Sequence, residues 1–167
     1  GGIVELNNIQ NDIEIKQLSS VERWPLKVII AITNKEKKSI SSSQAMKLSA
    51  SSSPFYSSWI NKQEADMCEG RLAIKNKDFE RLAAVSEHNC LKMHSVMWTT
   101  RPSIIYWNEA SLNCMHVIFT MDAGPQIKAV CLPENEAKIA QRLSEIKGVV
   151  SVMKSKLGYA PISRVMK

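Results

Sequence analysis

The fold of this chain can be read outward from the segment Leu26-Lys27-Val28-Ile29-Ile30-Ala31-Ile32-Thr33. Its apolar and mostly β-branched residues stand between Pro25 and the charged turn Asn34 to Lys38. A short apolar run bounded by turn residues predicts a buried strand. It is much shorter than the roughly 20 apolar residues that span a bilayer, so the run indicates a sheet core and not a membrane segment.

Further strands are predicted on both sides of this run. Upstream, Gly2 to Leu6 is a short apolar segment, and Ile13 to Leu18 alternates apolar and polar residues. Alternation with a period of two is typical of a half-exposed strand. Downstream, three more apolar segments predict strands: 127–132, 149–153 and 162–166.

Helices are predicted between these strands, most of them opened by a capping residue. Serines near Ser41 cap a helix to Ser53, and Ser53-Pro54 then reads as an N-cap followed by proline at the first helical position of a long helix. Asp78 and Asn108 are candidate caps of the next two helices, the second running through Leu112 and Met115. The last predicted helix spans 134–147 and is stopped by Gly148.

One predicted helix carries an apolar stripe with helical spacing after Asp78. A methionine-rich stripe can line a cofactor site or a groove, but core packing is the commoner role and is the interpretation favoured here. The stripe residues are Phe79, Leu82, Ala83, Ser86, Cys90, Met93 and Met97. The stripe and the order of elements together predict an α+β fold in which helices cover one face of an antiparallel sheet.

Length and composition fit one globular domain, residues 1–167. The chain is 44% hydrophobic and 23% charged, which excludes a disordered or low-complexity chain. Lysine and arginine outnumber aspartate and glutamate by 22 to 16, a net charge of +6. These lysines are scattered or interrupted by acidic residues, so the charge does not favour nucleic acid or a membrane as the partner. No signal peptide is visible, and a cytoplasmic protein is expected.

The cysteines and histidines predict neither a disulfide framework nor a metal site. No two of the four cysteines form a CxxC pair, and small buried side chains in a reducing compartment are expected of them. His88, His94 and His116 show no zinc-like spacing with the cysteines. We therefore predict no metal held by the cysteines and histidines of this chain.

The serine-rich stretch Ser39 to Ser58 has two interpretations. It could be a phosphorylated linker, but Met46, Leu48, Phe55 and Trp59 keep helical spacing through it. Two helix starts joined by a turn are therefore favoured.

The segment Phe119-Thr120-Met121-Asp122-Ala123-Gly124-Pro125 is built like a reaction site. An apolar approach ends at a carboxylate, and the small residues Ala123 and Gly124 would let a ligand come close to the backbone. Spacing alone favours the simpler interpretation, an aspartate that hydrogen-bonds within its own turn.

Met121 to Gln126 resembles the MDAGPN signature of the diphosphomevalonate decarboxylases, with Gln126 in place of asparagine. Other matching segments follow in the order of that family: Gly1 to Leu6, Trp24-Pro25, Ser53 to Tyr56, Lys77 to Phe79, Met93 to Ser95 and Arg101 to Trp107. The resemblance covers nearly the whole chain, but only the C-terminal half of such an enzyme.

That family belongs to the GHMP small-molecule kinases, and the resemblance implies their ferredoxin-like C-terminal domain. It implies that ATP binds to a phosphate loop in an N-terminal lobe, which this chain does not contain, and that Mg²⁺ is held mainly through the ATP phosphates. It also implies a homodimer and a C-terminal lobe that is inactive alone.

The activity implied is the ATP-dependent decarboxylation of (R)-5-diphosphomevalonate to isopentenyl diphosphate in isoprenoid biosynthesis. By this resemblance Asp122 is the catalytic base at the tertiary 3-hydroxyl, and Ala123 and Gly124 bring backbone close to the substrate. Two alternatives stay open: a related kinase that phosphorylates a mevalonate-like acid without decarboxylating it, and a basic module that binds nucleic acid or protein.

The junction of Ile118 with Phe119 departs from the family pattern. Family members have a helix end, a turn and the start of a strand here, and a helix cannot join a strand without a turn. We expect roughly ten residues to be missing between Ile118 and Phe119.

Overall fold

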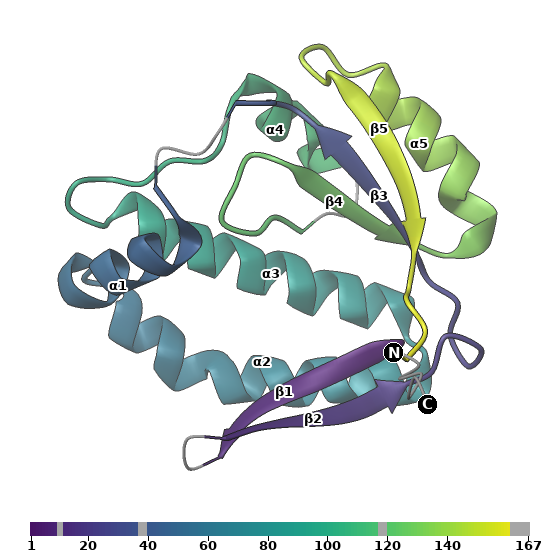
Figure 1. Cartoon of the computed structure of the whole chain (residues 1–167), viewed down its shortest axis with the longest axis horizontal. Helices are drawn as coiled ribbons and strands as arrows, with labels where there is room; N and C mark the ends of the chain where they lie inside the picture. Colours follow the sequence, from purple (N-terminus) through teal and green to yellow (C-terminus); the bar gives the residue numbers. More distant parts are fainter. Residues whose placement is uncertain (10–11, 37–39, 117–119, 161–167) are drawn as a thin grey trace, which may run out of the picture.

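Strand β3 (Lys27–Ile32) is the central strand of the main sheet. The computed structural model describes residues 1–9, 12–36, 40–116 and 120–160. In it, β4 (Ile127–Cys131) and β5 (Ser151–Lys156) flank β3, and both pairings are antiparallel (Figure 1). Ile29 and Ala31 of β3 have no exposed surface, so the predicted buried strand is confirmed.

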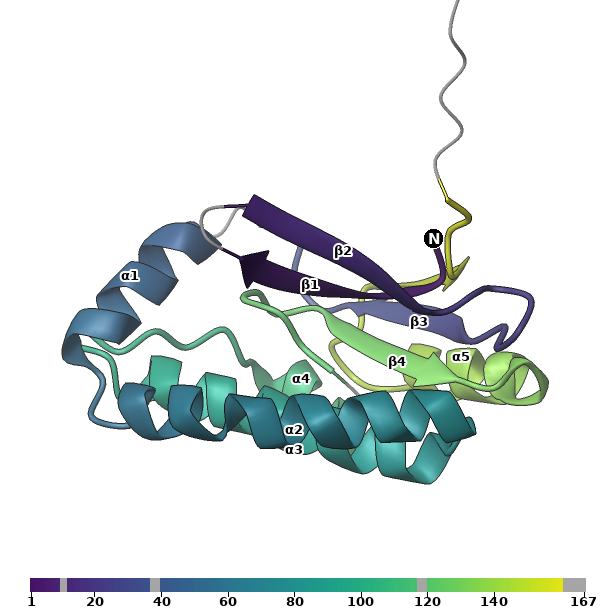
Figure 2. The same cartoon turned by 90° about the horizontal axis from the view of Figure 1, so that it is seen from below.

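The helices cover one face of this sheet, as the sequence predicts. Figure 2 shows α2 (Tyr56–Asn76), α3 (Phe79–Trp98) and α5 (Glu136–Ser144) on the same side of the strands. The core between them joins alternate residues of β3 and β4 to Cys90 of α3 and to Ala140 and Leu143 of α5. The α+β fold with a helix-covered antiparallel sheet is therefore confirmed.

A two-stranded hairpin stands apart from this sheet. Strands β1 (Ile3–Ile9) and β2 (Asp12–Ser19) pair antiparallel and lie over α2 (Figure 2). The amide of Gly2 donates to the carbonyl of Gly158 at 2.7 Å, which joins the start of the hairpin to the segment after β5. Four apolar side chains of the hairpin are exposed: Val4, Leu6, Ile13 and Ile15.

Three of the predicted helix caps are present. The Ser41 hydroxyl accepts from the amide of Gln44 and opens α1 (Ser42–Ser52). The Asp78 carboxylate accepts from the amide of Arg81 at the start of α3. The Asn108 side chain accepts from the amide of Ser111 and opens α4 (Glu109–Asn113).

The prediction that Ser53 caps the long helix is wrong. Ser53 is the C-terminal cap of α1, and α2 begins at Tyr56 after Phe55, which makes no side-chain cap. The Ser53 hydroxyl accepts from the amide of Phe55, so Ser53 and Pro54 form the turn between the two helices. The serine-rich stretch is therefore two helices joined by a turn, but only the first has a serine cap.

Two predicted helices are shorter than their patterns indicated. Helix α4 gives way to a 3-10 turn, η1 (Cys114–His116), and a second 3-10 turn, η2 (Pro133–Asn135), precedes α5.

Gly148 has a positive φ of 90°, and a Cβ there would lie 2.9 Å from the Cβ of Ala110. A glycine is therefore needed where the chain turns from α5 toward β5.

The cysteine prediction is confirmed in part. All four are free thiols, and Cys90, Cys114 and Cys131 are buried, but Cys68 is exposed on α2. The predicted strand 162–166 and the junction of Ile118 with Phe119 lie outside the described residues.

Candidate active site

Asp122 lies on the turn that leads into β4, with its side chain 75% exposed. The turn closes tightly, because the amide of Gly124 donates to the carbonyl of Asp122 at 2.8 Å. The turn opens onto a surface cavity of about 420 Å³, lined by Glu36, Asp122, Ala123, Gly124, Pro125, Gln126 and Lys128. The structure thus brings the three predicted site residues, Asp122, Ala123 and Gly124, to one cavity.

The carbonyl of Pro125 fixes the far side of this turn. It accepts from the Thr33 hydroxyl at 2.7 Å and from the Ser111 hydroxyl at 3.1 Å. Asn108 donates from Nδ2 to the Thr33 hydroxyl at 3.2 Å, so the cap of α4 belongs to the same network. Thr33 is 8% exposed and Ser111 is fully buried. The end of β3 and the start of α4 therefore hold the turn together.

Gln126 holds the same turn to the end of β3. Its Oε1 accepts from the amide of Thr33 at 2.8 Å, and its Nε2 donates to the carbonyl of Asn34 at 2.5 Å. These two bonds continue the pairing of β3 with β4 beyond Ile127, the first residue of β4. The glutamine that replaces the family's asparagine thus has a defined structural role in this chain.

Cys90 of α3 fixes the other side of the turn at Met121. The amide of Met121 donates to Cys90 Sγ at 3.2 Å, and the thiol donates to the Met121 carbonyl at 3.5 Å. Burial raises the pKa of the Cys90 thiol, and its hydrogen bonds to Met121 and Thr120 oppose that effect less strongly. The thiol therefore stays protonated and acts as a donor in the core.

Lys128 pairs with the Asp122 carboxylate. The ammonium of Lys128, from β4, contacts Asp122 Oδ2, and the Lys128 side chain is 31% exposed. Thr120 and Lys128 also exchange two backbone hydrogen bonds, at 2.8 and 2.9 Å, which close the strand pair around the turn. The cavity thus presents a carboxylate and an ammonium side by side.

A second cavity, of about 360 Å³, is also lined by Asp122. The hairpin, α2, α3 and the segment Thr120 to Asp122 form its walls. Leu82, Ser86, Cys90 and Met93 of the predicted apolar stripe face it. The stripe therefore lines this cavity as well as packing in the core, where Cys90 and Met97 are buried.

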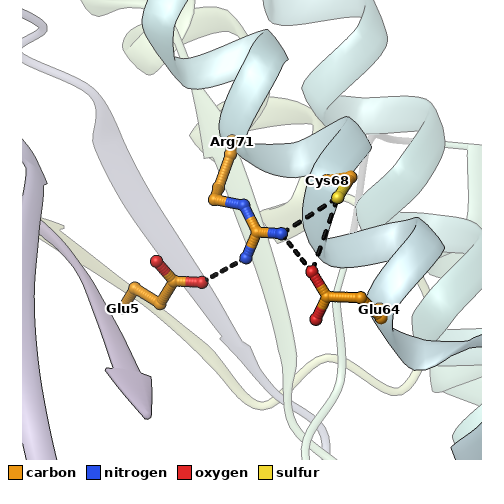
Figure 3. Close-up of polar contacts among 4 residues, drawn as sticks. All are labelled: Glu5, Glu64, Cys68 and Arg71. Atoms are coloured by element: carbon orange, nitrogen blue, oxygen red, sulfur yellow. Dashed lines mark hydrogen bonds and ion pairs between the residues drawn. The ribbon is translucent and has the colours of Figure 1, made fainter.

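Arg71 of α2 joins the wall of this second cavity to the hairpin (Figure 3). Its Nη1 contacts Oε1 of Glu5 on β1 at 2.5 Å, while its Nη2 contacts Glu64 and donates to Cys68 Sγ at 3.0 Å. Hydrogen bonds from Arg71, and then from Cys68, hold the pKa of Glu64 below its ordinary value. The Glu5 side chain is 4% exposed, so its charge is compensated inside the protein.

His94 lies close to the turn but does not reach the cavity. It is 1% exposed and packs edge-on against Trp107, with 5.4 Å between the ring centroids. Burial lowers the pKa of His94, and the Met121 backbone opposes this shift less strongly. His94 is thus a neutral core residue at neutral pH.

The described residues do not fit a magnesium site of their own. No group of three or more histidine, cysteine, aspartate or glutamate side chains gathers in the part of the chain that the structure describes. The cavity at Asp122 holds the carboxylates of Asp122 and Glu36 together with Lys128, whose positive charge disfavours a cation there.

Among the helices of the described ranges, none is long and apolar enough to cross a membrane.

Three site features escape sequence reasoning. Lys128 reads as an ordinary exposed strand residue, Thr33 as the end of a strand, and Asn108 as a helix cap. Thr33 and Asn108 join the site through contacts with residues distant in sequence, and Lys128 reaches Asp122 from the strand that follows the turn. No local pattern signals those contacts. Of the three, Thr33 has a local signal, because it is a polar residue at the end of an apolar strand.

Comparison with known proteins gives consistent matches. The family model described as "Mevalonate 5-diphosphate decarboxylase C-terminal domain" matches residues 28–157. The diphosphomevalonate decarboxylase of Schizosaccharomyces pombe is 25% identical over 162 residues, which cover 88% of this chain and 41% of the relative. The chain therefore spans less than half the length of this relative.

Solved structures agree with this match. The mevalonate diphosphate decarboxylase of Staphylococcus aureus is similar with a TM-score of 0.80 and 27% identity, covering 91% of this chain and 50% of that one. The structure "MDDEF in complex with MVAPP, AMPPCP and Magnesium" has a TM-score of 0.76 and 28% identity, covering 88% and 49%. Both alignments pair about nine-tenths of this chain with about half of a longer chain.

Proposed function

Because this chain belongs to the mevalonate 5-diphosphate decarboxylase family, in the part occupied by the C-terminal domain, we propose that the complete protein decarboxylates (R)-5-diphosphomevalonate. The substrates are diphosphomevalonate and ATP, and the products are isopentenyl diphosphate, ADP, phosphate and carbon dioxide. We assign residues 1–167 to one C-terminal domain of the GHMP type, which forms the wall of the active site that carries Asp122.

The main support is the Asp122 turn. It presents an exposed carboxylate at a cavity. Cys90 holds its backbone at Met121, Thr33 holds it at Pro125, and the side chain of Gln126 ties it to the end of β3. A general base needs a fixed position within hydrogen-bond reach of the proton that it takes. The turn supplies that position, with small neighbours at Ala123 and Gly124 that leave room for a substrate.

Asp122 serves the reaction at two stages. As the tertiary 3-hydroxyl attacks the γ-phosphate of ATP, its proton passes to the Asp122 carboxylate and ADP leaves with the bridging oxygen. This transfer converts the hydroxyl, a poor leaving group, into a phosphate ester. Departure of phosphate then leaves positive charge at the tertiary carbon, and the carboxylate of the substrate departs as carbon dioxide. Once Asp122 has passed that proton on to the departing phosphate, its carboxylate is negative again and stabilises the positive charge.

ATP and Mg²⁺ are assigned to a part of the protein outside this chain. The described residues offer neither a glycine-rich phosphate loop nor a cluster of metal ligands. A structure similar to this chain is named as a complex with an ATP analogue and magnesium, in a polypeptide about twice as long. The chain alone is therefore expected to be inactive. From the family resemblance we further propose that the complete protein is a cytoplasmic homodimer.

The test is carbon dioxide release by the full-length protein with ATP and diphosphomevalonate. We expect Asp122→Asn to lower the turnover number by about 10²- to 10⁴-fold, the range for loss of a positioned general base. Asp12→Asn, at an exposed aspartate on the hairpin, is the matched control and should leave turnover unchanged. A phosphorylated product without carbon dioxide would instead indicate a kinase, and unaltered turnover in Asp122→Asn would remove Asp122 from the mechanism.

A further inference from the structure

Among the described residues that line the cavity at Asp122, Lys128 carries the positive charge. Among the described residues that line it, the ionisable groups are the carboxylates of Glu36 and Asp122 and the ammonium of Lys128. The substrate of the proposed function is itself an anion, with a carboxylate and a diphosphate. Two carboxylates alone would repel such a molecule from the place where Asp122 must reach its hydroxyl.

The pairing of Lys128 with Asp122 adds little to folding. The Asp122 side chain is 75% exposed, and ion pairs at exposed positions contribute little to stability. A stabilising role therefore does not account for a lysine at this position of β4, where Ile127 and Ala129 on either side are fully buried. The pairing does bring an ammonium into contact with the proposed base.

We propose that Lys128 is a substrate-binding residue, whose ammonium holds an anionic group of the substrate beside Asp122. An ammonium has three donors, so Lys128 can keep one hydrogen bond to Asp122 while it donates another to the substrate. The same contact offsets the charge of Asp122, which lets the anionic substrate approach the carboxylate. This inference rests on the proposed function for the identity of the substrate.

The test measures binding in the full-length protein with Asp122→Asn as the background, so that turnover does not interfere. Adding Lys128→Met is expected to raise the dissociation constant of diphosphomevalonate by about tenfold or more, because a hydrogen bond to a charged group is lost. Lys128→Arg keeps the charge and should stay within about threefold of the background. Lys27→Met, at a lysine of β3 that pairs with Glu136 at 3.6 Å, is the matched control and should not change binding.

Two competitors identify the group that Lys128 holds. Inorganic diphosphate carries only the phosphate charges, and mevalonate carries only the carboxylate. We expect Lys128→Met to weaken competition by one of them and to leave the other unchanged. If Lys128→Met binds diphosphomevalonate as tightly as Lys27→Met does, the inference is wrong, since Lys128 then only neutralises Asp122.

The outcome for Lys128 is separable from the outcome for the proposed function. Carbon dioxide release is measured on the unmutated protein, and its absence would refute the decarboxylase assignment whatever Lys128 does. Carbon dioxide release combined with unchanged binding in Lys128→Met would refute only the role of Lys128. Circular dichroism melts of each variant establish that the protein is folded.

Discussion

The hydroxyl of Thr33 donates to the carbonyl of Pro125 at 2.7 Å, across 92 residues of sequence. This bond ties the end of the central strand to the turn that carries Asp122. The Asn108 side chain donates to the same hydroxyl, so Thr33 connects the turn to the start of α4 as well. The position of Asp122 therefore depends on a residue that does not itself line the cavity.

Replacing Thr33 by valine tests this dependence. Valine keeps the shape of the side chain but removes the hydroxyl, which leaves the Asn108 amide without that acceptor. We expect the turnover number of the full-length protein to fall about tenfold, and stability to fall by about 1–2 kcal/mol, the cost of a buried polar group left unpaired. The comparison is Thr33→Ser, which keeps the hydroxyl. Equal turnover in the two variants would show that Thr33 does not position the turn.

Gln126 provides an independent test of the same turn. Alanine at this position would remove both bonds to the end of β3 and leave the amide of Thr33 unpaired. We expect a loss of about 1–3 kcal/mol in the free energy of unfolding, measured in urea, and a lower turnover number. Asparagine is one methylene shorter and should keep one of the two bonds, so its effect should be intermediate. An alanine variant as stable as the natural protein would contradict this role.

Arg71 should hold the β1–β2 hairpin against α2. Arg71→Met leaves Glu5, which is 4% exposed, without its cation, and we expect a loss of about 2 kcal/mol in local stability. Hydrogen exchange of the hairpin amides measures this loss. Glu64→Gln removes the exposed partner of Arg71 and should cost no more than about 0.5 kcal/mol. Faster exchange in Glu64→Gln than in Arg71→Met would contradict the assignment.

His94 predicts a dependence of stability on pH. Burial lowers its pKa in the folded protein below the unfolded value of 6.5, so the folded state binds fewer protons. The stability that neutral His94 contributes is complete above pH 6.5 and is lost as the pH falls below it, by up to about 1.4 kcal/mol per pH unit. The melting midpoint of the full-length protein should therefore fall less between pH 7 and pH 5.5 in His94→Phe. His88→Gln, at an exposed histidine, should keep the full dependence.

The sequence predicts the strands of the main sheet and three of the helix caps, because both depend on neighbouring residues. The β-branched run of β3 and the capping side chains of Ser41, Asp78 and Asn108 act within a few residues of their own positions. Ser53 does not cap α2, because its hydroxyl accepts from the amide of Phe55 in the turn between α1 and α2. The pair Ser53-Pro54 fits a helix start and a turn equally well.

The site itself could be predicted only in part. The turn with Asp122, Ala123 and Gly124 stands out locally, and the structure brings these residues to a cavity. The partners that hold it, Thr33 and Cys90, lie at least 30 residues away in sequence, and Lys128 lies on the following strand. Such contacts are set by the packing of β3, β4 and α3 against each other, which no local pattern encodes.

The anchored turn also has a consequence for the thermodynamics of ligand binding. A loop that becomes ordered only when its ligand arrives loses conformational entropy, and that loss weakens the affinity. The backbone around Asp122 is already hydrogen-bonded at Met121 and Pro125, and the Gln126 side chain ties the turn to the end of β3. A substrate that enters this cavity meets a preorganised backbone, so little of its interaction energy is lost to immobilising the protein.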